Sequence, residues 1–159
     1  MARIEWRSSF WIYVALSAVV WIALSGEGRA QQGAARSATA SQANQGQAVR
    51  GKYIVESVAM CGNCHTPRDN QGRLERNHWL QGASLWILPA RPTTNWPLKA
   101  PRIGGNPPAT DEEMVTLLTT GIWKDGTRLR APMPQFRMSK DDAQSVVTYL
   151  KSLTPAPTE

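Results

Sequence analysis

The two cysteines of the chain are separated by only two residues, and a histidine directly follows the second one. Residues 61–65 read Cys-Gly-Asn-Cys-His, and none of the chain's other residues is a cysteine. This count excludes a disulfide-rich scaffold and a four-cysteine zinc site. The fold must therefore be organised by something that this short segment binds, or by side-chain packing alone.

The C-x-x-C-H sequence is the attachment motif for c-type haem. Two thiols at this spacing can form thioethers with the two vinyl groups of the macrocycle, and the adjacent histidine then lies beneath the iron. We therefore predict one covalently attached haem c, bound through Cys61 and Cys64, with His65 as an axial ligand of the iron. A thioredoxin-like redox pair is the alternative, but that pair should follow a strand in a βαβ pattern.

Haem iron takes a sixth ligand or keeps an open position. Met133 is the favoured candidate, because Pro132 and Pro134 restrict its neighbours to extended backbone that can present a thioether. Ligation by a second histidine, His78, is an alternative. The methionines that we expect to pack elsewhere or to lie too close to the motif are Met60, Met114 and Met138.

The first thirty residues have the pattern of an export signal. A basic start precedes an uncharged apolar stretch, Phe10–Leu24, and small residues follow at Gly28 and Ala30. The stretch is shorter than the roughly 20 residues of a membrane span. We expect residues 1–30 to be a cleaved signal peptide that delivers the chain to the periplasm. The alternative is an uncleaved anchor in the inner membrane, formed by residues 8–25.

Composition divides the remainder into three parts. Residues 31–46 are rich in Gln, Ala, Ser and Gly without apolar periodicity, so we predict a flexible linker. Residues 47–154 should form one domain, and residues 155–159 a tail.

Three segments of the domain have helical periodicity, at about Gln47–Met60, Thr110–Thr120 and Ser139–Leu153. Thr110 and Ser139 each begin a capping-box pattern. The predicted buried face of the first helix consists of Ala48, Gly51, Val55 and Val58.

The segment between the first two helices, Thr66–Ala109, is rich in proline and shows no adjacent strand-like runs. Three short helices and so long a loop make a poor core by themselves. We therefore predict an all-α fold in which three to four short helices and long loops wrap around the haem. The side chains expected to pack near the macrocycle or in the core are Trp79, Trp86, Trp96, Trp123, Met114, Leu117, Leu118, Val147 and Leu150.

Three features together resemble the small monohaem c-type cytochromes of the mitochondrial-cytochrome-like class: the helix leading into residues 61–67, the Pro-Met-Pro at 132–134 and the closing helix that ends at residues 149–153. The resemblance covers roughly residues 45–153. It implies the cytochrome c fold, with His65 and Met133 as the axial ligands of the iron.

The same resemblance implies that the first and last helices cross near Gly51 and Tyr149. It also implies that a proline carbonyl accepts a hydrogen bond from His65 Nδ1, and Pro89 and Pro92 are the candidates.

Two further segments, Thr66–Asp69 and Gly126–Leu129, are similar to cytochrome subunits that accept electrons from periplasmic dehydrogenases. This similarity implies a one-electron carrier between a dehydrogenase and an oxidase or another cytochrome, and not an enzyme by itself. The alternative is a haem sensor or catalytic haem protein with an open or labile sixth position.

Charge suggests the kind of partner. Residues 31–159 contain 15 Lys and Arg against 10 Asp and Glu. Arg68, Arg73 and Arg76 follow the motif closely, and they either steer an acidic redox protein or simply form a solvated loop. The export signal and the scattered charges argue against nucleic acid, and we expect membrane association only if the leader stays uncleaved.

Overall fold

The computed structural model describes residues 31–154, so the expected signal peptide and the C-terminal tail lie outside the described part of the chain. The chain divides into two units, residues 1–43 and 44–159. In the first unit, the described residues 31–43 are helical and exposed. No helix within the described range is long and apolar enough to cross a bilayer.

The predicted flexible linker is helical instead, because helix occupies residues 31–53. Alanine and glutamine are frequent here, and both have high helix propensity. The hydroxyl groups of Ser37 and Thr39 donate to the carbonyls of Gly33 and Ala35, at 3.0 Å each. The prediction relied on the missing apolar stripe, which an exposed helix does not need.

A π-helical turn, η1 (Ile54–Val58), follows this helix. Ala59 N donates to Ile54 O at 2.7 Å, which is the five-residue spacing of a π-helix. Ile54 and Val55 are buried, whereas Val58 is 57% exposed. The prediction that Val58 belongs to the buried face was wrong, because the wider turn rotates it away from the face that Gly51 and Val55 share.

The two later helices follow their predicted positions as α3 (Asp111–Thr120) and α4 (Lys140–Ser152). Thr110 and Glu113 form the predicted capping box. Only half of the second box is present. Ser139 Oγ accepts from Asp142 N, but the Asp142 carboxylate pairs with Arg50 Nε at 2.9 Å.

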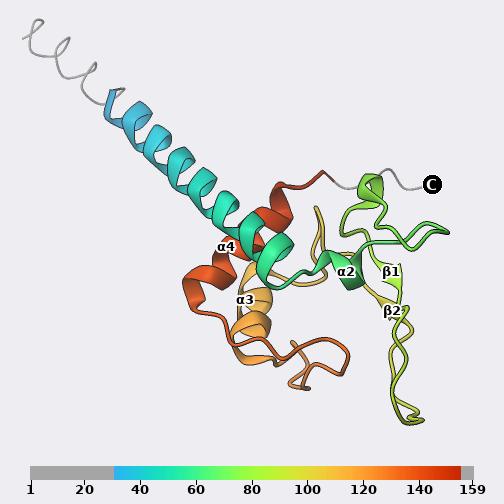
Figure 1. The fold of residues 1–159 in the computed structure, drawn as a ribbon. Coiled ribbons are helices and arrows are strands. Elements are labelled where there is room, and N and C mark those ends of the chain that lie inside the picture. The colour runs from blue at the N-terminus through green and yellow to red at the C-terminus, as the bar shows by residue number, and fades with distance from the viewer. Residues whose placement is uncertain (1–30, 155–159) are drawn as a thin grey trace, which may run out of the picture. The chain divides into compact units, whose positions relative to one another are not determined.

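The helix crossing implied by the resemblance is present. An ideal Cβ on Gly51 would lie 1.9 Å from Ser145 O and 2.8 Å from Tyr149 Cβ, so only glycine fits where the first helix meets α4. This contact, together with the packing of α3 on α4 (Figure 1), brings the helices around one core. Its buried apolar members are Ile54, Val55, Leu80, Ile103, Met114, Leu117, Leu118, Ala143, Val146, Val147, Tyr149 and Leu150.

The proline-rich segment contains more local structure than its sequence suggested. A short helix, α2 (Gly62–His65), comes directly before it. The segment's own elements are the 3-10 helix η2 (Arg76–His78), β1 (Ala83–Ser84) and β2 (Lys99–Ala100). β1 pairs antiparallel with β2, and residues 85–98 form the loop beyond them (Figure 1). Strands of two residues are too short to show an alternating pattern. The predicted mostly helical class is confirmed, with this one small strand pair added.

A candidate haem-attachment site

The motif forms a single helical turn. Cys61 caps α2, and its carbonyl accepts hydrogen bonds from Cys64 N at 3.3 Å and from His65 N at 3.0 Å. Residues three and four apart lie on the same side of a helix. The turn therefore presents both sulfur atoms and the imidazole together, and the two thiols are not joined by a disulfide.

His65 is held in one orientation. Its side chain is buried, and Nδ1 lies 2.8 Å from the carbonyl oxygen of Pro101. A carbonyl only accepts, so Nδ1 must carry the proton. Burial lowers the pKa of His65, and the Pro101 carbonyl partly opposes that shift. The ring is therefore a neutral imidazole whose Nε2 lone pair is available to a metal.

Pro101 corrects the expectation that Pro89 or Pro92 accepts this hydrogen bond. Pro89 and Pro92 both lie in the loop beyond β1 and β2, whereas Pro101 comes directly after β2. Gly82, just before β1, donates its N–H to His65 O at 2.8 Å, so both ends of the strand pair lie beside the histidine. Nothing local in the sequence distinguishes Pro101 from the other prolines.

Thr66, the residue directly after the motif, is also held by a hydrogen bond. Thr66 is 1% exposed, and its Oγ1 accepts a hydrogen bond from Leu80 N at 2.9 Å. Leu80 O in turn accepts from Ile103 N and Gly104 N, at 3.0 Å each. The chain before and after the strand pair is thus tied to the residue next to His65. Our sequence reasoning used Thr66 only as part of the segment Thr66–Asp69 and missed this structural role, although a small polar residue directly after the motif was the available signal.

Gly62, between the cysteines, gives room to a tryptophan. An ideal Cβ on this residue would lie 2.2 Å from the ring of Trp79. Trp79 is partly buried against the core, and the Arg76 guanidinium stacks over it at 4.3 Å from the ring centroid. This arrangement supports the core-packing interpretation of Trp79.

The other tryptophans differ in environment. Trp123 also packs against the core. Trp96 Nε1 donates to Ile87 O at 3.0 Å within the loop 85–98, and Trp86 is 60% exposed.

The Cys61 thiol lacks the properties of a redox-active cysteine. Burial raises its pKa to about 11. A thioredoxin-like pair needs a lowered thiol pKa, because the thiolate is the nucleophile. The turn therefore disfavours the redox-pair alternative, and it agrees with two thiols whose role is attachment.

The candidates for the sixth ligand of the iron differ in how deeply their side chains are buried. Met114 is in the core, and Met138 packs against it with its N–H on Leu118 O at 3.1 Å, as expected for both. Met60 is 53% exposed. His78 is also exposed and lies 3.1 Å from Glu75 through Nδ1, which fits a surface residue.

Met133 is partly exposed and is not one of the core side chains. Its N–H donates to Arg130 O at 3.1 Å, which closes a turn around the cis peptide between Ala131 and Pro132. The extended backbone predicted for this stretch is therefore a turn at its start. Met133 differs from Met114 and Met138 in being free of core packing.

Curated proteins provide the comparison with known functions. The chain is 32% identical over 116 residues to "Fructose dehydrogenase cytochrome subunit" of Gluconobacter japonicus, which covers 69% of this chain and 22% of that protein. It is 28% identical over 119 residues to "Alcohol dehydrogenase (quinone), cytochrome c subunit" of Gluconobacter oxydans (strain 621H), covering 68% and 24%. A segment of 33 residues is 48% identical to "Diheme cytochrome c-type" of Cereibacter sphaeroides, covering 21% and 11%.

The chain is a distant homologue of the c-type cytochromes. It spans less than a quarter of the length of the two dehydrogenase subunits that it matches. No family model matches it. The resemblance inferred from the motif is thereby confirmed, as is the mostly helical class.

The residues of the described domain fit a covalent haem c by their donor chemistry. Two thiols without a disulfide and a buried neutral imidazole stand on one turn. Nδ1 is already bound to a carbonyl, the usual partner of a metal-ligating histidine. Within residues 31–154 no group of three or more His, Cys, Asp or Glu side chains could hold a metal ion otherwise.

Proposed function

We propose that this chain is a one-electron carrier whose haem c is bound by thioethers to Cys61 and Cys64. His65 and Met133 are the proposed axial ligands. The observation that carries the proposal is the hydrogen bond of His65 Nδ1 to Pro101 O at 2.8 Å, on the same turn as two unpaired thiols. It commits the imidazole to the tautomer that ligates through Nε2.

In this proposal the polypeptide binds the haem and sets its reduction potential. Bound haem supplies the chemistry, a one-electron change between ferrous and ferric iron. The Pro101 carbonyl fixes the ring of His65 and increases its basicity. The thioether of Met133 favours the reduced state, since sulfur is a softer donor than nitrogen. The adjoining apolar core excludes water and disfavours the additional positive charge of the oxidised state.

The proposed location is the periplasm, because residues 1–30 have the pattern of an export signal. The proposed electron donor is a dehydrogenase, since two of the relatives are named as cytochrome subunits of dehydrogenases. The proposed acceptor is an oxidase or another cytochrome. Since His65 and Met133 would both bind the haem iron, no position would remain for a substrate, and the chain itself would perform no catalysis.

The test is optical and mass spectrometry of the protein produced with a working haem-attachment pathway. We expect the mass of one haem added to the polypeptide, a low-spin spectrum in both oxidation states, and no reaction with carbon monoxide. A high-spin ferrous form that binds carbon monoxide at once supports the sensor or catalytic alternative. A folded protein without colour contradicts both the electron-carrier proposal and the sensor or catalytic alternative.

A further inference from the structure

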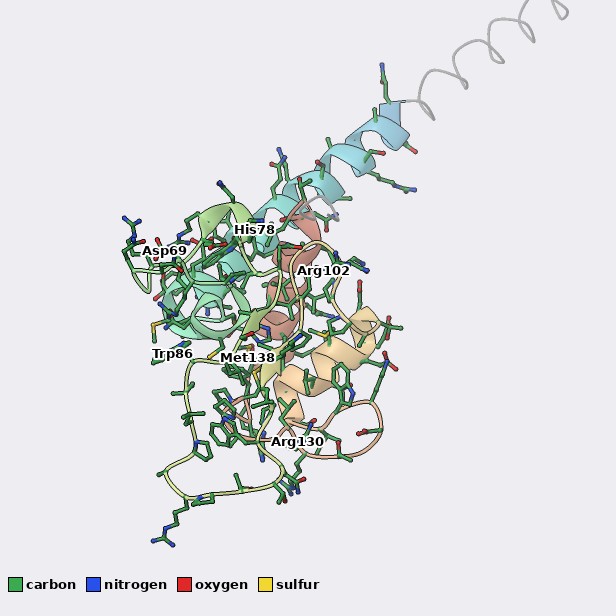
Figure 2. All side chains as sticks on the ribbon, turned by 90° about the vertical axis from the view of Figure 1, so that its right-hand side faces the viewer. Asp69, His78, Trp86, Arg102, Arg130 and Met138 are labelled. Carbon is green, nitrogen blue, oxygen red and sulfur yellow. The ribbon has the colours of Figure 1, made fainter. Side chains whose placement is uncertain are left out.

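An exposed tryptophan is attached to the turn between the two cysteines. Trp86 is 60% exposed, yet its Nε1 donates to Asn63 O at 3.2 Å. Arg68 stacks over the same ring at 5.0 Å from the centroid, and its guanidinium also donates to Asn63 O, at 3.4 Å. The indole is therefore held from two sides while much of its surface faces solvent. Figure 2 shows Trp86 on the same side of the domain as Asp69.

Other exposed apolar side chains belong to the same loop or to the start of the cysteine turn. Asn63 Nδ2 contacts the sulfur of Met60 at 3.9 Å, and Met60 is 53% exposed. Leu88 and Leu98, in the loop 85–98, are 79% and 74% exposed. We call these four residues, Met60, Trp86, Leu88 and Leu98, the hairpin patch. Clusters of exposed large apolar residues mark interaction sites on soluble proteins.

The segment that carries the hairpin patch has a net positive charge. Residues 60–105 contain six Lys and Arg and two Asp and Glu. Both acids have a basic neighbour, Asp69 in an ion pair with Arg73 and Glu75 beside His78. Within the described residues, Arg68, Arg91 and Lys99 have no acidic partner at ion-pair distance. A surface of this kind complements an acidic one.

We propose that the hairpin patch docks an acidic redox protein, with Trp86 as its central contact. The inference rests on the proposed function, because it identifies the surface through which the carrier exchanges electrons. Tryptophan and arginine dominate binding energy at protein interfaces, and a side chain that is already fixed loses little conformational entropy on binding. A partner in contact with Trp86 is one hydrogen bond from the backbone of the cysteine turn.

The experiment compares two electron donors on the full-length holoprotein. Reduced flavodoxin, a small acidic flavoprotein, tests docking, and free reduced riboflavin tests access to the haem without docking. Stopped-flow mixing at low and high salt gives the rate constant for each donor.

Tyr53→Ala is the matched control for Trp86→Ala. Tyr53 is also an aromatic residue that is 55% exposed and has an arginine, Arg50, at 5.8 Å from its ring centroid, but it lies on the first helix. Arg91→Glu tests charge, and Arg36→Glu, on the exposed helix of residues 31–43, is its control.

We expect Trp86→Ala to slow reduction by flavodoxin roughly tenfold, while leaving the riboflavin rate and the visible spectrum unchanged. Arg91→Glu should slow the flavodoxin reaction at low salt only, and both controls should behave as the wild type does. These results would support the proposal.

Three outcomes would overturn it. An unchanged flavodoxin rate in Trp86→Ala means that the patch does not dock this partner. An altered spectrum or a slower riboflavin reaction means that Trp86 covers the haem. The patch binds a membrane instead if Trp86→Ala abolishes binding to anionic phospholipid vesicles and leaves the flavodoxin rate unchanged. A wild-type chain without haem contradicts the proposed function itself, and is recognised before any variant is made.

Discussion

The imidazole of His65 donates its Nδ1 proton to the carbonyl of Pro101, a residue 36 positions further along the chain. The intervening segment leaves the histidine at Gly82 and returns to it directly after β2. A contact between residues so far apart fixes the ring only if the returning backbone is itself rigid. Proline supplies that rigidity, since its ring fixes φ.

Substituting Pro101 by glycine should therefore loosen the carbonyl without removing it. We expect the reduction potential to rise by up to about 60 mV, equivalent to tenfold in the redox equilibrium, because a weaker hydrogen bond makes His65 less basic and stabilises the ferric state less. Protein-film voltammetry measures the shift. Pro92→Gly, in the exposed loop 85–98, is the control, and an equal shift in both variants would show that the carbonyl contact plays no part.

The proposed sulfur ligand can be tested against a methionine of known environment. Met133→Ala should abolish the sulfur-to-iron charge-transfer band of the ferric protein and lower its potential. Met138→Ala should keep the band and reduce the free energy of unfolding by about 2 kcal/mol, because Met138 packs against the core. Persistence of the band in Met133→Ala would exclude this residue as the ligand.

The crossing of the first helix and α4 predicts a strong effect at one glycine and the opposite effect at another. In Gly51→Ala the new methyl group would meet Ser145 O, so unfolding should become easier by at least about 2 kcal/mol. Gly46 is an exposed helical residue with nothing within 4 Å of an added Cβ, and Gly46→Ala should stabilise by about 0.5–1 kcal/mol. Thermal and guanidinium denaturation measure both, and equal effects would contradict the crossing.

Tyr149 gives the domain a dependence on alkaline pH. Its hydroxyl donates to Glu56 at 2.5 Å, and burial, followed by the Glu56 carboxylate, raises the pKa of the tyrosine from 10.0 to about 12. Because the folded pKa is the higher one, this stabilisation is complete below pH 10 and is lost as the pH rises toward 12. The free energy of unfolding should fall more steeply across this interval in the wild type than in Tyr149→Phe. Parallel curves for the two proteins would contradict the shift.

The sequence was sufficient wherever the signal is local. The Thr110 capping box and the buried stripes of α3 and α4 were predicted from spacing, since each depends on neighbours within one or two turns. Gly51 was identified for the same reason, because a glycine on an apolar helix face needs a close neighbour.

The features that we did not predict depend on contacts between distant residues, or on local geometry that no short stretch of sequence reveals. Pro101 was missed because its partner is far along the chain and many prolines looked equivalent. Val58 was misplaced because a π-turn changes the helical period, and no sequence pattern announces it. The helix of residues 31–46 was missed for the opposite reason, that propensity alone can support an exposed helix without an apolar stripe.

The two ends of the segment that carries β1, β2 and the loop beyond them lie in close contact. Gly82 and Pro101 lie so close that an ideal Cβ on the glycine would be 3.1 Å from the proline carbonyl carbon. Insertions and deletions beyond this contact leave the histidine support untouched. Under the proposed function, the tip of this loop can therefore change in length and sequence independently of His65, so that the surface offered to an electron-transfer partner can be exchanged while the hydrogen bond that would support the haem ligand is kept.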